Sequence, residues 1–403
     1  MYKERLRNWI HTLEQFGHRG SGTEQEAKAA RYLVEELESM GIPAQTEPFT
    51  GSSNMGARLV THVIFSAAGL VFISTYPLLM ATFALIGLIS LILESTTKFV
   101  LLSKPFVRRP SQNVVGVIPA KTKASRRILL VAHYDTQRTG LLWVQAANSS
   151  MGSKLDALPG VMKSPMFVVL CSMSIQIVLG LLMPLGLAPS WAMWLFVPAG
   201  VFYSLGFFLL GEWALRDFVP GANDNASGTA AVLGLAHRWK EERPANTDDI
   251  ELVLLLTGCE EPGLIGASAY AEQHKPSIQS TPTNFINIDS IGYGHPQIIG
   301  GEYTLAGQSV RYQAPLLALA SEVAKTCDGP IAEPIIIPVQ SDGMAFELRG
   351  IHGLSFISRP DDHSMPNYHL PSDLLKNLDM DAVTEGFEFS WSVLHRLSTQ
   401  PPS

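Results

Sequence analysis

Two long stretches of this chain contain no Asp, Glu, Lys or Arg. They run from residue 59 to 93 and from residue 165 to 211. Because a helix needs about 20 apolar residues to cross a bilayer, each stretch predicts a hairpin of two membrane-spanning helices. The turns are expected near Pro77 and between Pro184 and Pro189. The first stretch is long enough for two passes only if its second helix continues to Leu102. The alternative interpretation is that both stretches form buried or interfacial helical hairpins.

The overall composition is typical of a membrane-associated protein that also has a globular part. Charged residues make up only 16% of the chain, against roughly 25% in an average soluble domain. The lipid bilayer is therefore an expected partner. The net charge of −7 provides no basic surface for nucleic acid, so DNA and RNA are not expected to bind. Cys171, Cys259 and Cys327 lie far apart and predict neither a disulfide framework nor a cysteine-based zinc site.

The charged segments beside the two stretches predict how the chain is oriented in the membrane. Two complete hairpins leave all remaining segments on one side of the bilayer. Residues 1–58 contain seven Lys and Arg and residues 94–163 contain eleven, whereas the hairpin tips contain none. The positive-inside rule therefore places the soluble part in the cytoplasm. The N-terminal segment lacks the apolar core of a signal peptide, so we expect no secretory signal there. The two hairpins therefore predict a multi-pass integral membrane protein.

Outside the two stretches, short apolar segments alternate with segments of helical periodicity. Several apolar segments show no polar alternation, as expected of strands covered on both faces. The pattern predicts an α/β fold with a mixed, mostly parallel central sheet flanked by helices. The expected strands are 113–118, 127–132, 251–256, 284–288, 334–338 and 353–358, and the expected helices are 24–40, 228–242, 264–274, 312–326 and 380–397.

Acidic and histidine side chains follow several of these expected strands. Because ligands of open α/β sheets bind beyond the carboxyl ends of the strands, these side chains are expected to lie close together. Two imidazoles and three carboxylates form a ligand set suited to two zinc-like ions, with one carboxylate bridging them. The set consists of His133, Asp224, Glu261, Asp289 and His369.

Two further carboxylates have expected roles beside this set. Asp135, two residues after His133, can orient that imidazole by accepting a hydrogen bond from it. Glu260, next to Glu261, can act as the general base of a hydrolase. Taken one at a time, an Asp or His after a strand is more often a turn or capping residue. Their occurrence together favours a catalytic metal site.

The ordered segments HYD, DNASG, CEEPGLIGASAY, NIDSIG and YHLPSD resemble the di-zinc exopeptidase family that includes bacterial leucyl aminopeptidases and glutamate carboxypeptidases. The N-terminal segment EQFGHRGSGTEQEAKAARYLVEELESMGI also resembles the leading helices of that family. The resemblance implies two Zn²⁺ ions as cofactors, with Co²⁺ or Mn²⁺ as substitutes, and a peptide as substrate.

The resemblance also implies a role for each residue. His133 and Asp289 hold one zinc, Glu261 and His369 hold the second, and Asp224 bridges the two. Glu260 becomes the general base and Asp135 the partner of His133. Tyr368 matches a position where some relatives place a hydroxyl against the tetrahedral oxyanion, although a packing role is the alternative. The family further implies a cis peptide between Asp224 and Asn225.

Some features depart from the family pattern. The second uncharged stretch lies between His133 and Asp224, so both hairpins are expected to interrupt one catalytic domain formed by residues 1–58, 103–164 and 212–403. The hairpins would occupy 59–102 and 165–211. Cys259 stands where relatives often have glycine, and we interpret it as a small buried residue. His363 is a rival to His369 as a ligand, and Gly343 replaces a histidine that relatives often carry.

The sequence therefore predicts a membrane-anchored zinc metallopeptidase, with an aminopeptidase as the leading interpretation. A carboxypeptidase of the same fold and a single-zinc acyltransferase similar to glutaminyl cyclases are the alternatives. A membrane scaffold without activity is the third class, but no expected ligand is missing from this chain.

Overall fold

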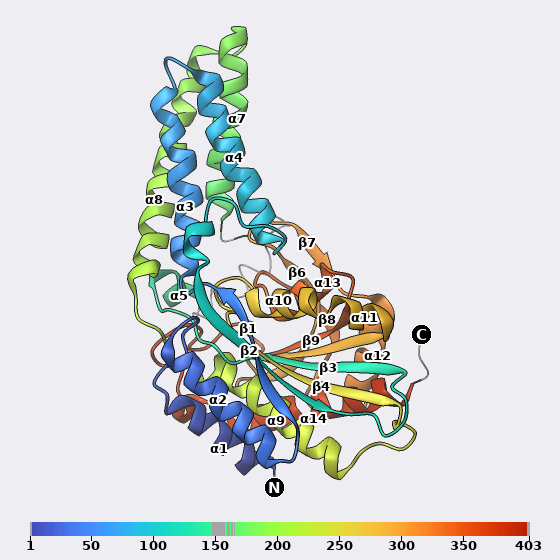
Figure 1. Cartoon of the computed structure of the whole chain (residues 1–403). Coiled ribbons are helices and arrows are strands. Elements are labelled where there is room, and N and C mark those ends of the chain that lie inside the picture. The colour runs from blue at the N-terminus through green and yellow to red at the C-terminus, as the bar shows by residue number, and fades with distance from the viewer. Residues whose placement is uncertain (1, 147–157, 159–161, 163, 165, 401–403) are drawn as a thin grey trace.

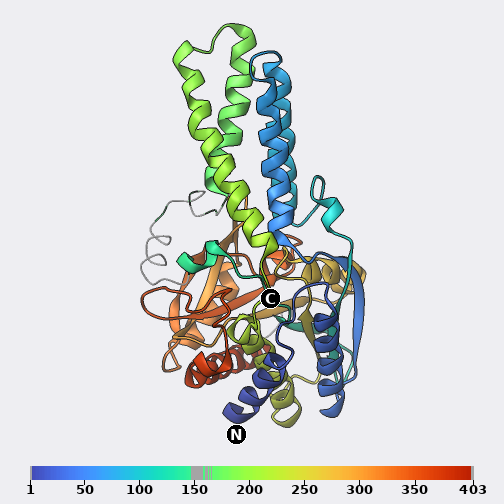
Figure 2. The same ribbon diagram turned by 90° about the vertical axis from the view of Figure 1, so that its left-hand side faces the viewer.

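The computed structural model describes residues 2–146, 158, 162, 164 and 166–400. It has an α/β body from which a bundle of four helices projects on one side (Figure 1). Figure 2 shows that the bundle stands on a single flank of the body, with both chain termini in the α/β part.

The body is built on one nine-stranded sheet. Its strands are β1 (Ala44–Gly51), β2 (Arg109–Ile118), β3 (Arg126–His133), β4 (Ile250–Thr257), β5 (Thr283–Asp289), β6 (His295–Tyr303), β7 (Ser309–Arg311), β8 (Ile331–Ile337) and β9 (His352–Arg359). They are arranged in the order β1-β2-β4-β3-β5-β9-β6-β7, and β8 pairs with β6. The four central strands β4, β3, β5 and β9 are parallel to one another, whereas β1, β2, β6 and β7 join through antiparallel pairs.

Helices cover both faces of the sheet. One face packs against α1 (Tyr2–Glu14), α2 (Glu24–Ser39), α9 (Gly228–Glu241), α12 (Ala314–Ala324) and α14 (Met380–Thr399). The other face packs against α10 (Ile265–Gln273) and α13 (Asp342–Glu347), and α11 (Lys275–Ser280) follows α10 directly. Because both faces are covered, strands such as β4 are continuous apolar runs. The predicted mixed α/β fold is confirmed.

Each uncharged stretch forms a helical hairpin. The first consists of α3 (Met55–Ala68), a short 3₁₀ turn and α4 (Pro77–Ser95), and the second of α7 (Phe167–Leu182) and α8 (Phe196–Leu215). Within the described residues, four helical segments are long and apolar enough to cross a membrane: 55–72, 77–95, 167–185 and 190–215. The two helices of each hairpin pack on each other, and the hairpins pack together through α4 with α7 and α3 with α8.

The bundle has a tightly packed interior with a few polar contacts. A Cβ atom on Gly180 would lie 2.6 Å from the carbonyl oxygen of Pro77, so a small residue is required where α7 crosses α4. The side chain of Gln176 donates hydrogen bonds to the carbonyls of Ser66 and Met80, at 3.0 and 2.9 Å, and accepts one from the Tyr203 hydroxyl. Outward positions of α8 carry exposed apolar side chains, for example Phe207 and Phe208.

The first hairpin begins earlier than the sequence predicts. Helix α3 starts at Met55, and α4 stops at Ser95 instead of continuing to Leu102. Arg58 directly precedes the first uncharged stretch, where the positive-inside rule favours a residue at the membrane interface, but it is buried inside the structure at 2% exposure. The reason is an ion pair with Glu94, whose carboxylate lies 2.8 Å from the guanidinium. Lys98 and Lys104 are exposed after α4, and Lys163 lies outside the described residues.

Further differences concern the edges of the sheet. Strands β1, β6 and β7 were not predicted; β1 is a polar edge strand and β6 contains two consecutive glycines. Helices α1 and α11 and the short helices α5 (Leu141–Ala146) and α13 were not predicted either. The other expected strands and helices occur with boundaries shifted by a few residues.

Removal of Glu94 should destabilise the protein strongly. In Glu94→Ala, Arg58 keeps its charge at a buried position without its partner, which costs about 3 to 5 kcal/mol of unfolding free energy. Equilibrium unfolding of the detergent-solubilised protein measures this loss. The exposed Glu35 provides the control, because Glu35→Ala should change the free energy by less than about 0.5 kcal/mol. The double change Arg58→Met with Glu94→Leu should regain most of the stability, because it removes both buried charges. Equally small effects of Glu94→Ala and Glu35→Ala would contradict a stabilising role of the Arg58–Glu94 ion pair.

Candidate metal centre

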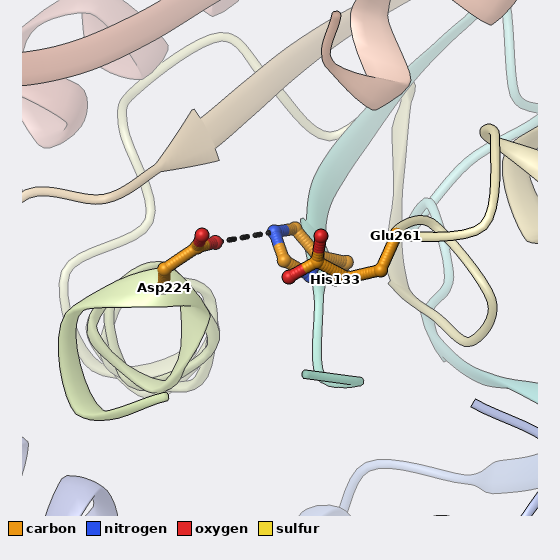
Figure 3. Close-up of side chains that lie close together, drawn as sticks. All are labelled: His133, Asp224 and Glu261. Carbon is orange, nitrogen blue, oxygen red and sulfur yellow. Dashed lines mark ion pairs between the residues drawn. The ribbon is translucent and has the colours of Figure 1, made fainter. Parts of the chain in front are cut away.

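Three neighbouring parallel strands end at the candidate site. β3 ends in His133, β5 ends in Asp289, and β4 is followed by the loop that carries Glu260 and Glu261. Asp224 comes from the segment 222–227 before α9, and His369 from the loop after β9. Figure 3 shows that the side chains of His133, Asp224 and Glu261 point toward one another. Ligand atoms of these three residues all lie within 4.8 Å of one another.

The Asp224 carboxylate lies between two imidazoles. Its Oδ1 atom is 3.2 Å from Nε2 of His133, and its Oδ2 atom is 2.9 Å from Nε2 of His369. The two oxygens therefore face different histidines, which is the arrangement that a bridging carboxylate requires. The peptide bond between Asp224 and Asn225 is cis, as the family resemblance implies.

Each imidazole has a second carboxylate beside it. Nε2 of His133 lies 3.7 Å from Oδ1 of Asp289, and Nε2 of His369 lies 3.3 Å from Oε2 of Glu261. The structure thus brings all five expected ligands into one cluster, arranged as a pair on either side of Asp224. Their role as metal ligands remains a prediction.

The hydrogen bonding of the cluster fits a pair of cations. Nδ1 of the buried His369 and Oε1 of Glu261 have no hydrogen-bond partner within the described part of the chain, and Nε2 of His369 faces only carboxylate oxygens there. Buried polar atoms are normally satisfied. Unsatisfied imidazole and carboxylate atoms that converge at short distances are the donor set that zinc binds. The residues present therefore fit the two ions that the motifs predict.

The protonation equilibria of the cluster reflect its excess of buried negative charge. Burial raises the pKa of Glu261 to about 7, against the opposing charge of His369. Burial alone would lower the pKa of His369, but the charges of Glu261 and Asp224 raise it to about 9. For Asp224, burial would raise the pKa, yet contact with the two imidazoles holds it well below its ordinary value. Protons thus compensate part of the charge that cations would otherwise neutralise.

Glu260 and Asp135 lie directly beside the cluster. Glu260 is buried, and burial raises the pKa of its carboxyl group well above the ordinary value. Nδ1 of His133 lies 3.2 Å from the carbonyl oxygen of Asp135 and 3.7 Å from its carboxylate. The closer contact is therefore to the backbone. The Asp135 carboxylate instead accepts hydrogen bonds from the backbone N–H groups of Glu260 and Glu261, at 3.0 and 3.3 Å, and so fixes the loop of the two glutamates.

Tyr368 stacks on the neighbouring His369, with ring centroids 3.7 Å apart. Trp143 of α5 stands edge-on to His369 at 4.3 Å between centroids. Burial raises the pKa of Tyr368 well above its ordinary value, so the hydroxyl remains a hydrogen-bond donor. Tyr368 lines the same small cavity as Glu260, Glu261 and Asp289.

Several residues that position the cluster were missed by the sequence analysis. The Asp373 carboxylate accepts hydrogen bonds from the backbone N–H groups of Asn223 and Asp224, at 2.8 and 3.1 Å. The Asn225 side chain bonds to the backbone of Ile288 and Ser290, which joins the bridge to the end of β5. Asn225 and Asp373 belong to the quoted segments DNASG and YHLPSD, so the motifs could have indicated their positioning roles.

Two more positioning residues were not predicted: Gln137 lies outside the quoted segments, and Arg19 lies in the quoted N-terminal segment but was assigned no role. Gln137 donates to the Glu261 carboxylate at 2.9 Å. The fully buried guanidinium of Arg19 donates to the carbonyls of Tyr134, Pro220 and Gly221, and thereby holds the end of β3 against the segment before Asp224.

The remaining sequence candidates lie at the edge of the site or outside it. Cys259 is buried and has a φ of 51°, a conformation that favours glycine. His363 lines the larger cavity beside His369. His274, His295 and His352 pair with Glu47, Glu385 and Glu347. At Gly343, a Cβ atom would lie within 2.3 Å of the Tyr312 hydroxyl, so a histidine has no room there.

Residues 208–393 match the sequence profile described as Peptidase family M28. The matched region contains Asp224, Glu260, Glu261, Asp289 and His369. This part of the chain is therefore similar to the M28 peptidases. The resemblance recognised from the motifs is confirmed over this region.

Individual relatives agree with this assignment. The aminopeptidase YwaD of Bacillus subtilis is 27% identical over 178 residues, which are 42% of this chain but only 36% of the relative's own length. Among solved structures, the zinc aminopeptidase BSAP of Bacillus subtilis has a TM-score of 0.55 at 15% identity, with 98% of this chain and 94% of that chain covered. A glutaminyl cyclase of Bacteroides thetaiotaomicron has a TM-score of 0.54 at 14% identity, with 98% and 97% covered. The family match supports the expected class, a peptidase, and the solved structures show that the fold is that of zinc aminopeptidases and glutaminyl cyclases.

Without zinc, the protein should lose stability as the pH rises. The folded-state pKa of Glu261 is raised from 4.5 to about 7 and that of His369 from 6.5 to about 9, so the folded state binds more protons than the unfolded state between about pH 5 and 9. The low pKa of Asp224 acts in the opposite sense only in strong acid. Melting temperatures of chelator-treated protein at about pH 6 and about pH 9 measure the effect. Zinc-loaded protein is the control and should lose less stability over this interval, because metal replaces protons. Higher stability of the chelated protein at the alkaline pH would contradict the prediction.

Proposed function

We propose that this chain is a membrane-anchored di-zinc exopeptidase that removes N-terminal residues from peptides. The observation that carries the proposal is the Asp224 carboxylate, whose two oxygens face His133 and His369 at 3.2 and 2.9 Å. A second carboxylate lies beside each imidazole, and Glu260 is buried next to the cluster. This arrangement supports two ions held by one bridging ligand.

In the proposed site, His133 and Asp289 would hold one zinc and Glu261 and His369 the other, and Asp224 would be shared between them. Zinc bound there would polarise the scissile carbonyl and lower the pKa of water. Gln137 fixes the orientation of Glu261 through its hydrogen bond. Asp135 holds the backbone of both glutamates in place, so that Glu260 and Glu261 face the reaction from one rigid loop.

Glu260 is the proposed general base and acid. Its carboxylate takes a proton from the attacking water and returns it to the nitrogen of the leaving amine. The carboxyl group is buried and lines the same cavity as Glu261 and Tyr368, so it lies where such a transfer would occur. Tyr368, protonated and beside His369, can donate a hydrogen bond to the oxyanion that develops on the scissile carbonyl.

The choice of reaction depends on the relatives and on the number of ions. The curated relative is named as an aminopeptidase, which favours cleavage at the amino end. A glutaminyl cyclase shares the fold, and a single-zinc acyltransferase similar to such cyclases is the alternative that the sequence leaves open. Two equivalents of bound zinc together with peptide hydrolysis support the peptidase, whereas one equivalent supports the cyclase.

Glu260→Gln should abolish most turnover but leave zinc binding intact. The amide keeps the shape of the carboxylate but cannot accept a proton, so kcat should fall roughly 100- to 10,000-fold. Hydrolysis of aminoacyl amides and elemental analysis of the same sample measure the two quantities. Glu35→Gln, at an exposed position of α2, is the control and should change neither. Full activity of Glu260→Gln at unchanged zinc content would exclude Glu260 as the base.

His369→Ala should lose one of two zinc equivalents as well as activity. The change removes an imidazole that faces both Asp224 and Glu261. Elemental analysis after removal of free zinc decides this, and His274→Ala, which changes a partly buried histidine paired with Glu47, is the control. Retention of two tightly bound ions in His369→Ala would contradict the ligand assignment.

The proposal of membrane anchoring rests on the four long apolar helices and on their exposed apolar surface. Trp191, Trp194 and Tyr76 are exposed at the tips of the hairpins, where aromatic residues favour the bilayer interface. We keep the division into one interrupted catalytic domain, residues 1–58, 103–164 and 212–403, and two hairpins, 59–102 and 165–211. The flanking Lys and Arg support our proposal that this domain faces the cytoplasm.

The proposed cytoplasmic orientation of the catalytic domain predicts which surface positions react with an impermeant thiol reagent. In a background without the three native cysteines, Leu187→Cys at the tip of the second hairpin should be labelled in intact cells. Lys123→Cys, between β2 and β3, should be labelled only after permeabilisation. The reverse pattern would place the active site on the outer side, and equal labelling of both positions without permeabilisation would contradict the membrane-spanning arrangement.

A further inference from the structure

A cavity of about 370 Å³ connects the metal cluster with the base of the helix bundle. Its volume lies in the range of small-molecule sites. At one end the cavity is lined by Glu260, Glu261, Tyr368 and His369. This end is acidic and lies directly at the proposed reaction centre.

The opposite end of the cavity is made by the membrane hairpins. Met55 and Leu59 of α3, Val169 of α7, and Leu205 and Leu209 of α8 line it. All of these side chains are apolar. A ligand that fills the whole cavity therefore needs a polar end at the cluster and a hydrocarbon group toward the bundle.

The apolar wall extends far along α8. Leu205 lies ten positions before Leu215, the last residue of α8, which corresponds to about 15 Å along the helix axis. Leu205 is 45% exposed and also lines the cavity, and the adjacent Phe207 and Phe208 are more than half exposed. The cavity wall thus includes a helix segment that, in the proposed arrangement, lies within the hydrocarbon of the bilayer.

We infer that the substrates are amphiphilic peptides that partition into the bilayer, with a long apolar side chain at the N-terminal residue lying in this cavity. The inference rests on the proposed function, because it assumes the scissile bond at the metal cluster. In this orientation the N-terminal amine lies at the polar end of the cavity, beside Glu260 and Glu261. The apolar side chain then points toward α3, α7 and α8.

The length of the side chain provides the first test. The full-length, zinc-loaded protein in detergent hydrolyses aminoacyl coumarin amides whose N-terminal residue is alanine, leucine, 2-aminooctanoic acid or 2-aminodecanoic acid. Each additional methylene group that becomes buried should raise kcat/KM roughly threefold to fourfold until the cavity is full. A flat or falling series, with alanine and leucine amides still hydrolysed, would overturn the inference and leave the proposed function intact. Failure to hydrolyse any of the amides would instead contradict the proposed function.

Variants of α8 test whether this particular cavity is responsible. Leu209→Trp fills the bundle end and should reduce the ratio of kcat/KM for the 2-aminodecanoyl amide to that for the alanyl amide by at least tenfold. Leu209→Ala enlarges the cavity and should shift the preferred side chain to a greater length. Phe208→Trp changes the neighbouring residue, which is not part of the lining, and should leave the ratio unchanged. Equal ratios in Leu209→Trp, Leu209→Ala and the wild type would overturn the assignment of the cavity.

Access from the bilayer is tested with the protein reconstituted in phosphatidylcholine vesicles. For the 2-aminodecanoyl amide, the rate should follow the mole fraction of substrate in the lipid when the amount of lipid is varied at constant total substrate. For the alanyl amide, the rate should follow the aqueous concentration alone. A rate for the long-chain amide that depends only on its aqueous concentration would show that the substrate enters from water.

Discussion

The concentration of buried carboxylates around Asp224 is the constraint on which the site depends. Asp224, Glu260, Glu261 and Asp289 converge in a space that also holds two imidazoles. Buried charges of one sign are costly unless they are paired. Bound protons neutralise part of this charge, as the raised pKa values of Glu261 and His369 indicate. A pair of divalent cations would neutralise more of it. The chemistry of the site and the stability of the fold are therefore coupled through the same charges.

The hairpins occupy places where the α/β body can accept a long insertion. β1 and β2 pair as neighbours with Gly51 opposite Arg109, so the whole first hairpin replaces the turn of an antiparallel strand pair. The second hairpin lies between the end of β3 and the segment that carries Asp224. Both insertions start and finish near the carboxyl ends of the central strands. They thereby add walls to the active-site region without disturbing the sheet.

Much of the fold was predictable because strands that are buried on both faces consist of continuous apolar residues. Strands such as β3 and β4 are unbroken apolar runs, and the polar residue at each end marks the edge where the cluster forms. The edge strand β1 has no such trace, since its pattern is polar and it depends on pairing with the distant β2. Likewise, the motifs contained the five clustered residues, whereas Arg19 and Gln137 act through contacts with residues more than 100 positions away. Such contacts have no local signal.

The buried Arg58 links the membrane part to the catalytic loop. Besides its ion pair with Glu94, its guanidinium donates a hydrogen bond to the carbonyl of Pro262, the residue directly after Glu260 and Glu261. Glu94 comes from the end of α4, so both helices of the first hairpin contribute to this contact. The first hairpin is thus a structural support of the loop that carries Glu260 and Glu261. A shortened protein that lacks this hairpin would lose that support, and activity measured on such a fragment would not represent the activity of the whole chain.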